Sequence, residues 1–397
     1  MKTTPFFPAA IYAPQEQNQT VPRVLVAPPK YVQGPGVLEH AGRYMSVLNI
    51  RRAGVLASAR GHAAEAAQVI AGLSGSGVAC MPVTFTGECS LEAIDASADA
   101  LAEENVDCLI AVGGGKCVDA GKCIAYRLDV PVVVVPTLAS NDAPCSAVSV
   151  LYTPDGVMSG IEFFPQNPVL VIVDTEVVAS APERYLVAGM GDAMATWYEA
   201  KVCLENPAAR NVLGARPTLA ACALGELCAS TLYADGHNAS AAVLCGVVDE
   251  SLERIVEANT LLSGIGFESG GLAAAHGLAQ GFTVLPAVEK NYLHGEMVAM
   301  GVVTQLMLQN DAAEARRVAE FFARVGLPIH LGQIGLAANQ GKEIASVAAG
   351  AMAFPSIHNL PFEVTQESIT QAMLDADKLG RSVAATVGDE AYRRIQS

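Results

Sequence analysis

The sequence predicts an α/β half with a mostly parallel sheet followed by an all-α half, and two observations support this fold class. Before about residue 180, short β-branched runs alternate with helical patterns, which is typical of a parallel sheet covered by helices. After Asp174 the strand signals stop, and long Ala-, Leu- and Glu-rich helical patterns follow. The chain of 397 residues is long enough for two domains. We therefore expect an N-terminal arm over 1–22, an α/β domain over 23–180 and a helical domain over 181–397.

The individual elements are predicted from the same patterns. The run from Val132 to Val135 is apolar throughout, which suits a strand covered on both faces. The predicted strands are 24–27, 53–57, 81–85, 108–112, 132–135 and 169–173, and the helices between them are 36–48, 61–73, 90–104 and 116–127. In the second half the predicted helices are 183–203, 208–233, 239–262, 271–281, 294–309 and 311–325, with shorter ones to about 388.

Composition restricts the partners and the compartment. The chain carries 24 Lys and Arg against 40 Asp and Glu, a net charge of −16, which disfavours binding to nucleic acid and to anionic membrane surfaces. Hydrophobic residues make up 51% and charged residues 16%, which leaves a membrane protein or a heavily buried soluble one. The uncharged stretch 269–288 contains several glycines, His276 and Pro286, and is a poor membrane span. The N-terminus lacks the apolar core of a signal peptide, so we expect a cytoplasmic protein, and the apolar surplus favours a homo-oligomer.

The ten cysteines give no sign of a structural cross-link. They are scattered along the chain, and no pair has C-x-x-C spacing. We therefore expect neither a disulfide framework nor a structural zinc site with a local signature. Most of the thiols should instead be small buried hydrophobic groups.

Two loops at strand ends are candidates for ligand binding. The run 108–112 is followed by Gly113, Gly114, Gly115 and Lys116, where a helix begins. Glycines let the backbone approach a ligand, and a helix N-terminus offers free N–H groups to a pyrophosphate. The run 132–135 is likewise followed by polar and turn residues, at the end of the sheet where α/β proteins place ligands. The alternatives are a plain strand-to-helix turn for the first loop and a helix-capping loop for the second.

Five blocks of the sequence carry a resemblance to a known family. They are GGGKCVD (113–119), PTLASNDAPCS (136–146), LVAGMGDAMATW (186–197), GIGFESGGLAAAH (264–276) and LHGE (293–296). In this order they resemble the glycerol dehydrogenases, a family of the iron-containing (group III) alcohol dehydrogenases in the superfamily of dehydroquinate synthase. The resemblance covers about 23–386. It implies a dehydroquinate synthase-like fold, with a Rossmann-like dinucleotide-binding domain over 23–180 and a helical metal- and substrate-binding domain over 181–397.

The resemblance implies a metal site. The family binds one divalent metal, usually zinc, at positions that correspond to Asp192, His276 and His294. Two imidazoles and one carboxylate leave a coordination position open for substrate. Taken singly, each residue has another interpretation: Asp192 as the N-cap of a helix, His276 as a satisfied core histidine, and His294 as a surface residue in a first helical turn.

The resemblance also implies cofactor and substrate residues. Gly115 and Lys116, with Gly113 and Gly114 beside them, would lie along the pyrophosphate of NAD. Further cofactor-binding positions are Asp119 and a set that lines the nicotinamide half: Thr137, Ser140, Ser146, Val148 and Tyr152. Asp142 matches an acid that faces the substrate hydroxyls beside the metal, and it joins the three ligands as a catalytic candidate; Phe267 would form part of the substrate wall.

One position departs from the family pattern. Members that prefer NAD usually carry an Asp at the end of the second strand, where this chain has Ser58. A carboxylate there repels a 2′-phosphate, whereas Ser58 tolerates one and Arg60 is placed to pair with it. NADP is therefore possible beside NAD. The alternative is that Arg60 is a solvated surface cation and NAD binds through the other loops.

The resemblance implies a metal-dependent polyol dehydrogenase. Such an enzyme transfers a hydride between a small, neutral vicinal diol and a nicotinamide cofactor and yields a hydroxyketone such as dihydroxyacetone. One alternative is a cyclising lyase like dehydroquinate synthase, which needs a cationic phosphate site that the sequence does not display near its ligand positions. A second alternative is a non-catalytic nucleotide-binding protein.

Overall fold

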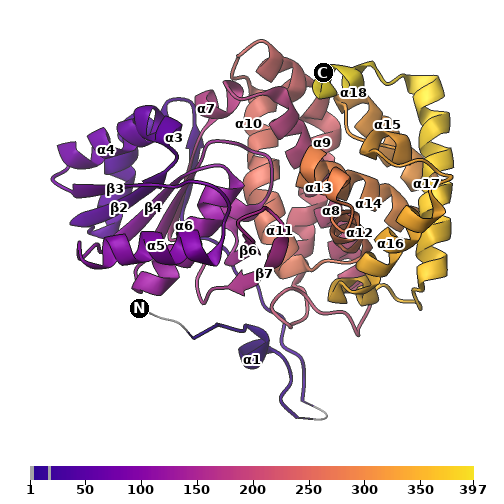
Figure 1. Cartoon of the computed structure of the whole chain (residues 1–397), viewed down its shortest axis with the longest axis horizontal. Helices are drawn as coiled ribbons and strands as arrows, with labels where there is room; N and C mark the ends of the chain where they lie inside the picture. Colours follow the sequence, from indigo (N-terminus) through magenta and orange to yellow (C-terminus); the bar gives the residue numbers. More distant parts are fainter. Residues whose placement is uncertain (1–3, 17–18) are drawn as a thin grey trace.

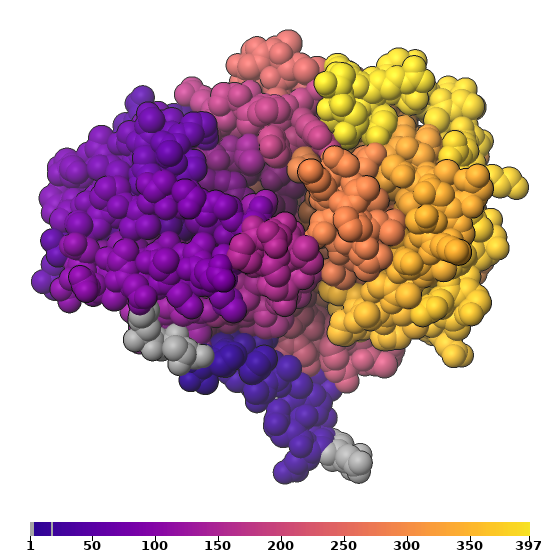
Figure 2. Space-filling model, viewed as in Figure 1, coloured from indigo at the N-terminus to yellow at the C-terminus, as the bar shows by residue number. Residues whose placement is uncertain are grey.

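The structure, a computed structural model, describes residues 4–16 and 19–397 and consists of an α/β half and a helical half (Figure 1). The predicted arm over 1–22 includes 1–3 and 17–18, which lie outside the described residues. The rest of the arm contains the short helix α1 (Ala9–Tyr12) and projects from the body of the molecule (Figure 2). The surface is hollowed between the two halves (Figure 2).

The α/β half is built on a six-stranded sheet in which every neighbouring pair is parallel. In spatial order the strands are β1 (Tyr31–Gly34), β8 (Leu170–Asp174), β5 (Val132–Pro136), β4 (Cys108–Gly113), β2 (Arg52–Ala57) and β3 (Ala79–Thr84). The central strands are almost wholly buried because helices cover both faces, as a parallel sheet requires. The predicted mostly parallel sheet is confirmed.

Two apolar clusters hold the helices against the sheet. One cluster joins one face to residues of α2 and α4, and the other joins the opposite face to α5 and α6. The elements around the sheet are η1 (Val37–His40), α2 (Ala41–Met45), η2 (Ser46–Leu48), α3 (Ala59–Ala63), α4 (Glu65–Gly75), α5 (Leu91–Ala102), α6 (Gly115–Leu128), η3 (Ala143–Cys145) and α7 (Thr175–Ala179). These helices leave the carboxyl ends of the central strands free to carry ligand loops.

The second half is helical, as predicted, and among the described residues no strand follows β8. Its central element is α8 (Glu183–Glu205), which is buried along most of its length and packs on α9, α11 and α14. The other elements are α9 (Leu219–Leu244), α10 (Glu250–Glu257), the π-helix η4 (Ala258–Leu262), α11 (Ser263–Gly270), α12 (Ala274–Phe282), α13 (Pro286–Asn291), α14 (His294–Leu308), α15 (Ala312–Val325), η5 (Leu331–Ile334), α16 (Gly341–Met352), η6 (Pro355–Asn359), α17 (Gln366–Val387) and α18 (Glu390–Gln396).

One strand expectation was wrong, and one pair of strands was missed. The run 24–27 is not a strand of the sheet, because the N–H and C=O groups of Val26 are both bonded to the Ser269 hydroxyl of the helical half, at 3.0 and 3.1 Å. The first strand is instead Tyr31–Gly34. The structure also contains an antiparallel hairpin, β6 (Val148–Tyr152) with β7 (Met158–Phe163), which the sequence patterns did not reveal.

Two helix boundaries also differ from the expectation. The helix predicted over 208–233 begins at Leu219, after the Thr218 side chain caps it, and continues to Leu244. The residues before it form a loop because the side-chain Oδ1 of Asn211 accepts the N–H groups of Leu213 and Ala215. The helix predicted over 239–262 is interrupted between Leu244 and Glu250, where Gly246 has a φ of +62°.

Two expectations from composition are addressed by the structure. All ten cysteines are free thiols, and eight of them are buried, as predicted. Within the described ranges, no helix combines the length and the apolar character needed to cross a bilayer.

Candidate metal centre and nucleotide site

Three helices bring the predicted metal ligands together. Asp192 lies in the middle of α8, His276 in the first turn of α12, and His294 begins α14. The Nε2 atoms of His276 and His294 lie 3.3 and 3.4 Å from Oδ1 of Asp192. One ligand atom from each residue lies within 4.8 Å of the other two. The N-cap interpretation of Asp192 was wrong, since α8 begins at Glu183.

The Asp192 carboxylate provides the test of whether these residues fit a metal. Both of its oxygens are buried and have no hydrogen-bond donor in the described structure, a costly state for an ionised group. Burial favours the neutral acid, yet the imidazoles of His294 and His276 hold the pKa of Asp192 below its usual value. Two imidazoles beside an unpartnered carboxylate are the donor set of a divalent transition metal, so the residues fit the implied cation.

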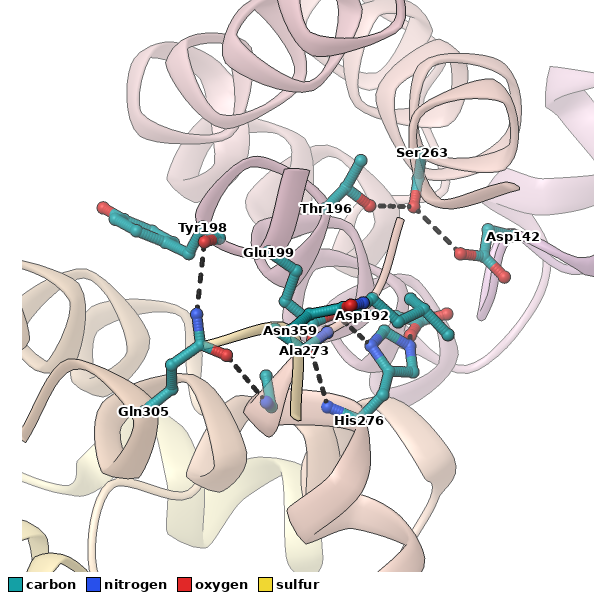
Figure 3. A network of polar contacts seen from close by, with 12 residues as sticks. Asp142, Asp192, Thr196, Tyr198, Glu199, Ser263, Ala273, His276, Gln305 and Asn359 are labelled. Atoms are coloured by element: carbon teal, nitrogen blue, oxygen red, sulfur yellow. Dashed lines mark hydrogen bonds and ion pairs between the residues drawn. The ribbon is translucent and has the colours of Figure 1, made fainter. Parts of the chain in front are cut away.

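Glu199 orients His276 and was missed from the sequence. Its Oε2 lies 2.5 Å from Nδ1 of His276, and its Oε1 accepts the N–H groups of His276 at 3.0 Å and Ala273 at 2.8 Å (Figure 3). In the neutral tautomer whose Nδ1 proton is donated to Glu199, the Nε2 atom carries a lone pair that points toward Asp192. A signal was present in the sequence, because Glu199 follows Asp192 by two helical turns and shares its face of α8.

The charges around His276 favour a cation. Burial opposes protonation of His276, but the carboxylates of Glu199 and Asp192 raise its pKa well above the usual value. The pair of acids therefore makes this pocket negative, and positive charge is needed to balance it.

His294 is positioned by the helix end that it begins. Glu296 accepts the N–H of Leu293 at 2.7 Å, which caps α14. The Arg184 guanidinium binds both Glu296 oxygens at 2.8 Å, and the Gln396 amide donates to the same carboxylate at 2.6 Å. His294 is half exposed in the first turn of α14, which agrees with its alternative interpretation as a surface residue. Its Nε2 nevertheless faces Asp192.

The glycine loop has the form of an anion site. β4 ends at Gly113 and α6 begins at Gly115. The first N–H groups of an α-helix precede its hydrogen-bond ladder and point outward, where a pyrophosphate is stabilised. In α6 the Cys117 N–H already donates to the Gly114 carbonyl at 3.0 Å, so the positions that remain are those of Gly115 and Lys116. A Cβ on Gly115 would lie 2.6 Å from Nδ2 of Asn141, so a side chain there would displace the Asn141 amide. The Lys116 ammonium lies at the same end and pairs with Glu88 at 2.6 Å.

The second predicted loop lies beside the first. The Thr137 N–H donates to the Gly113 carbonyl at 3.1 Å, so the loops after β4 and β5 are adjacent. Of the other predicted cofactor residues, Ser140 is half-buried in this loop, and Val148 and Tyr152 are half-buried on β6.

Two predicted cofactor residues have structural partners inside the protein. Asp119 pairs with Lys122 at 2.9 Å and accepts the N–H of Val150 at 3.2 Å. Ser146 is buried, and its hydroxyl lies 3.2 Å from the Ala143 carbonyl. These contacts hold the second loop and the β6–β7 hairpin on α6.

Asp142, the predicted substrate acid, lies near the ligand residues (Figure 3). Its Oδ2 accepts the Ser263 hydroxyl at 3.2 Å, and that hydroxyl lies 2.9 Å from the hydroxyl of Thr196 on α8. Burial and the negative charge of Asp192 raise the pKa of Asp142 well above its usual value. Phe267, the predicted wall residue, is buried on α11.

Glu268 is a second buried acid that was missed from the sequence. Its Oε1 accepts the N–H of Ala147 at 3.0 Å, and its Oε2 accepts the Asn167 amide at 2.7 Å. Burial raises the pKa of Glu268 to about 7, against the effect of these donors and of Lys122. The carboxyl joins α11 to the segment that precedes β6.

Ser58 lies at the carboxyl end of β2, as predicted, and caps α3 by accepting the N–H of Gly61 at 3.1 Å. Arg60 is exposed, and its guanidinium is 3.0 Å from Oε1 of Glu65. Arg60 is thus a surface cation with a carboxylate partner, which any 2′-phosphate would have to replace.

Comparison with known proteins agrees with these features. The family described as iron-containing alcohol dehydrogenase matches residues 28–175. The chain is 43% identical over 361 residues to a glycerol dehydrogenase from Citrobacter freundii, covering 90% of this chain and 98% of the relative. It is 48% identical over 299 residues to a glycerol dehydrogenase from Thermotoga maritima, covering 75% of this chain and 81% of the relative. A solved structure, a probable glycerol dehydrogenase from Sinorhizobium meliloti, matches with a TM-score of 0.84 at 38% identity, covering 91% of this chain and 99% of the other.

Replacing Glu199 by Gln tests the orientation of His276. The amide is expected to donate to Nδ1, which moves the imidazole proton to Nε2 and blocks its lone pair. We expect zinc affinity to fall by about 10- to 100-fold, measured by competition with a chromogenic chelator. Glu183→Gln, which alters another buried acid of α8, should leave the affinity unchanged. Wild-type affinity in Glu199→Gln would contradict the assignment.

Glu268 makes stability depend on pH. Because its pKa rises from 4.5 to about 7 on folding, the folded chain holds a proton that the unfolded chain releases between these values. As pH rises through this window, the free energy of unfolding of the wild type should fall by about 3 kcal/mol relative to Glu268→Gln. Denaturant unfolding of metal-free protein at a series of pH values measures the difference. Parallel pH curves for the two proteins would refute the raised pKa.

Proposed function

Because this chain belongs to the iron-containing alcohol dehydrogenase family, we propose that it is a metal-dependent polyol dehydrogenase, which transfers a hydride between a small vicinal diol and NAD. The relatives named glycerol dehydrogenase support a glycerol-like diol as substrate. In this proposal the α/β half to about residue 180 binds the dinucleotide, and the helical half binds metal and substrate.

The observation that carries the proposal is the unpartnered carboxylate of Asp192, buried between two imidazoles. A buried acid without donors is retained where a cation completes it. Asp142 is beside this group and lies within the loop that follows β5, next to the glycine loop. Metal, diol and nicotinamide would therefore meet at one place.

The chain's residues have distinct roles in this reaction. Asp192, His276 and His294 would hold the metal, which when bound supplies a Lewis acid that lowers the pKa of the substrate hydroxyl. The carboxyl of Asp142 would bind a diol hydroxyl and exchange its proton. The backbone N–H groups at the start of α6 would hold the pyrophosphate and so fix the nicotinamide half against the β5 loop.

The charges near the site disfavour the alternative function, a cyclising lyase. Such an enzyme needs cations for a substrate phosphate. The charged groups beside the candidate ligands are instead the acids Glu199 and Asp142, which would repel a phosphate and tolerate a neutral diol. A non-catalytic nucleotide-binding protein would have no need of an orphaned carboxylate between two imidazoles.

Three finer features belong to the proposal. Zinc is the proposed metal, because two imidazoles and one carboxylate are typical of zinc sites with an open position. NADP is proposed as a second cofactor because Ser58 carries no charge to repel a 2′-phosphate. A homo-oligomer is proposed because Leu219 and Leu227 of α9 are 72% and 51% exposed, which is apolar surface that a second copy would bury.

Metal removal tests the central claim. Chelator-treated protein should lose glycerol-dependent reduction of NAD, followed by the absorbance of the reduced nicotinamide, and zinc should restore it. Removal of a residue that only orients a metal ligand costs up to about 100-fold in activity. Asp192→Asn should lower the activity by more than this, and added zinc should not restore it. Polyol oxidation that survives complete metal removal would refute the proposed function.

Ser58→Asp tests the cofactor preference. The new carboxylate should repel a 2′-phosphate and accept a ribose hydroxyl, so kcat/KM for NADP should fall relative to NAD by about tenfold or more. Ser58→Asn keeps a neutral N-cap for α3 and is the matched control. A large NAD preference in the wild type, or an equal effect of both variants, would contradict a role for Ser58.

A further inference from the structure

The loop after β5 is bonded to one continuous helical run of the other half. We call residues 137–148 the nicotinamide loop, after its proposed role, and the run 258–270, formed by η4 and α11, the clamp helix. Asn259 of the clamp helix donates to the Ala139 carbonyl at 2.9 Å. The contacts of Ser263 with Asp142 and of Glu268 with Ala147, described above, complete a set spread along the loop.

We propose that Asn259, Ser263 and Glu268 form a latch through which the helical half positions the nicotinamide loop, and that Glu268 is its principal positioning residue for dinucleotide binding. The proposal rests on the proposed function, because it assigns the loop to the nicotinamide half of the cofactor. It adds a role for three residues that touch neither the metal ligands nor the glycine loop.

Two glycines show how closely the latch packs. A Cβ on Gly264 would lie 2.7 Å from Cβ of Cys145 and 3.1 Å from the Asp142 carbonyl oxygen. A Cβ on Gly189 of α8 would lie 2.0 Å from the Ala139 carbonyl oxygen. The loop backbone is therefore seated directly on both helices, and a displacement of either helix must displace the loop.

The loop is also held by a buried cation of the α/β half. The Lys122 ammonium on α6 donates to the Ala143 carbonyl at 3.0 Å and to the Val148 carbonyl. Lys122 thus binds carbonyl oxygens of the loop, while Glu268 binds the N–H of Ala147 between them. The hydrogen bonds from the Lys122 ammonium are charge-assisted, and with the bond to Glu268 one group from each half fixes the same short segment.

Asn259 connects the latch to the metal centre. Its amide donates to the Leu186 carbonyl at 3.0 Å as well as to Ala139, and Leu186 lies on α8, the helix of Asp192. Asn259 lies in the π-helical turn, a feature that occurs frequently at functional sites. One side chain therefore joins the helix of a metal ligand to the loop that would hold the nicotinamide.

Glu268→Gln tests the latch, with Asp377→Asn as the matched control. Asp377 is also a buried carboxylate that accepts one backbone N–H, from Leu331 at 3.0 Å, and one side-chain N–H, from Arg381 at 2.8 Å. Binding of reduced dinucleotide is followed in metal-free protein by energy transfer from Trp197, the single tryptophan. We expect the dissociation constant to rise about tenfold in Glu268→Gln and to stay within about twofold in Asp377→Asn. Exchange of the Ala147 amide hydrogen should be faster only in Glu268→Gln.

A second pair of variants tests the same latch by steric means. Gly264→Ala should push the segment from Asp142 to Cys145 off the clamp helix and weaken dinucleotide binding. Gly75→Ala, at a helical glycine where an added Cβ meets nothing within 4 Å, should not. In the metal-loaded enzyme Glu268→Gln should raise KM for the dinucleotide more than it lowers kcat, which overall destabilisation does not produce.

The outcomes separate the latch from the proposed function. The latch is overturned if Glu268→Gln binds dinucleotide as the wild type does, or if Asp377→Asn weakens binding equally. If the wild type binds no dinucleotide, the proposed function fails, and exchange of the Ala147 amide decides the latch alone. An unchanged exchange rate in Glu268→Gln then overturns it.

Discussion

The two carboxylates buried on one face of α8 are the constraint around which the helical half is arranged. Ionised groups in a protein interior must be paired, and each of these acids is met by the start of another helix. Glu199 accepts N–H groups at the beginning of α12, and the imidazoles of His276 and His294 face Asp192 from the first turns of α12 and α14. The positive ends of two helix dipoles thus face the negative face of α8, which stabilises the acids even before a cation is added.

Close packing of α14 on α8 follows from the same requirement. A Cβ on Gly295 would lie 1.8 Å from the Ala188 carbonyl oxygen, and a Cβ on Gly191 would lie 2.3 Å from the Gly295 carbonyl oxygen. Only residues without a side chain let the first turn of α14 approach closely enough for His294 to face Asp192. The Arg184–Glu296 pair then fixes the direction in which α14 leaves the site.

The division into a parallel sheet and a helical half could be predicted because strands and helices each have a characteristic spacing of apolar residues along the sequence. The candidate metal ligands could be named only through a family resemblance, since Asp192, His276 and His294 meet through the packing of three helices. The Asp192 N-cap interpretation failed because Gly191 permits close packing and does not mark a helix start. Glu199 and Glu268 were missed because an acid in a helical pattern looks like a solvated residue until its burial is known. The run 24–27 was misread because a strand and an extended segment bonded to Ser269 have the same local pattern.

Because the chain is acidic, the two loops proposed to bind the nucleotide must attract its pyrophosphate through local groups. A net charge of −16 gives no general attraction for a pyrophosphate, so binding depends on local N–H groups and on how accurately the two loops are held. Hydride transfer requires the nicotinamide carbon and the substrate carbon at contact distance, while in the proposed function one would be held by the α/β half and the other by the helical half. The distance between them is therefore set by whatever joins the halves. Asn259 binds both Leu186 of α8 and Ala139 of the loop, and Ser263 joins Thr196 of α8 to Asp142 of the loop. The candidate metal centre and the proposed nicotinamide loop are therefore linked by hydrogen bonds instead of being fixed independently.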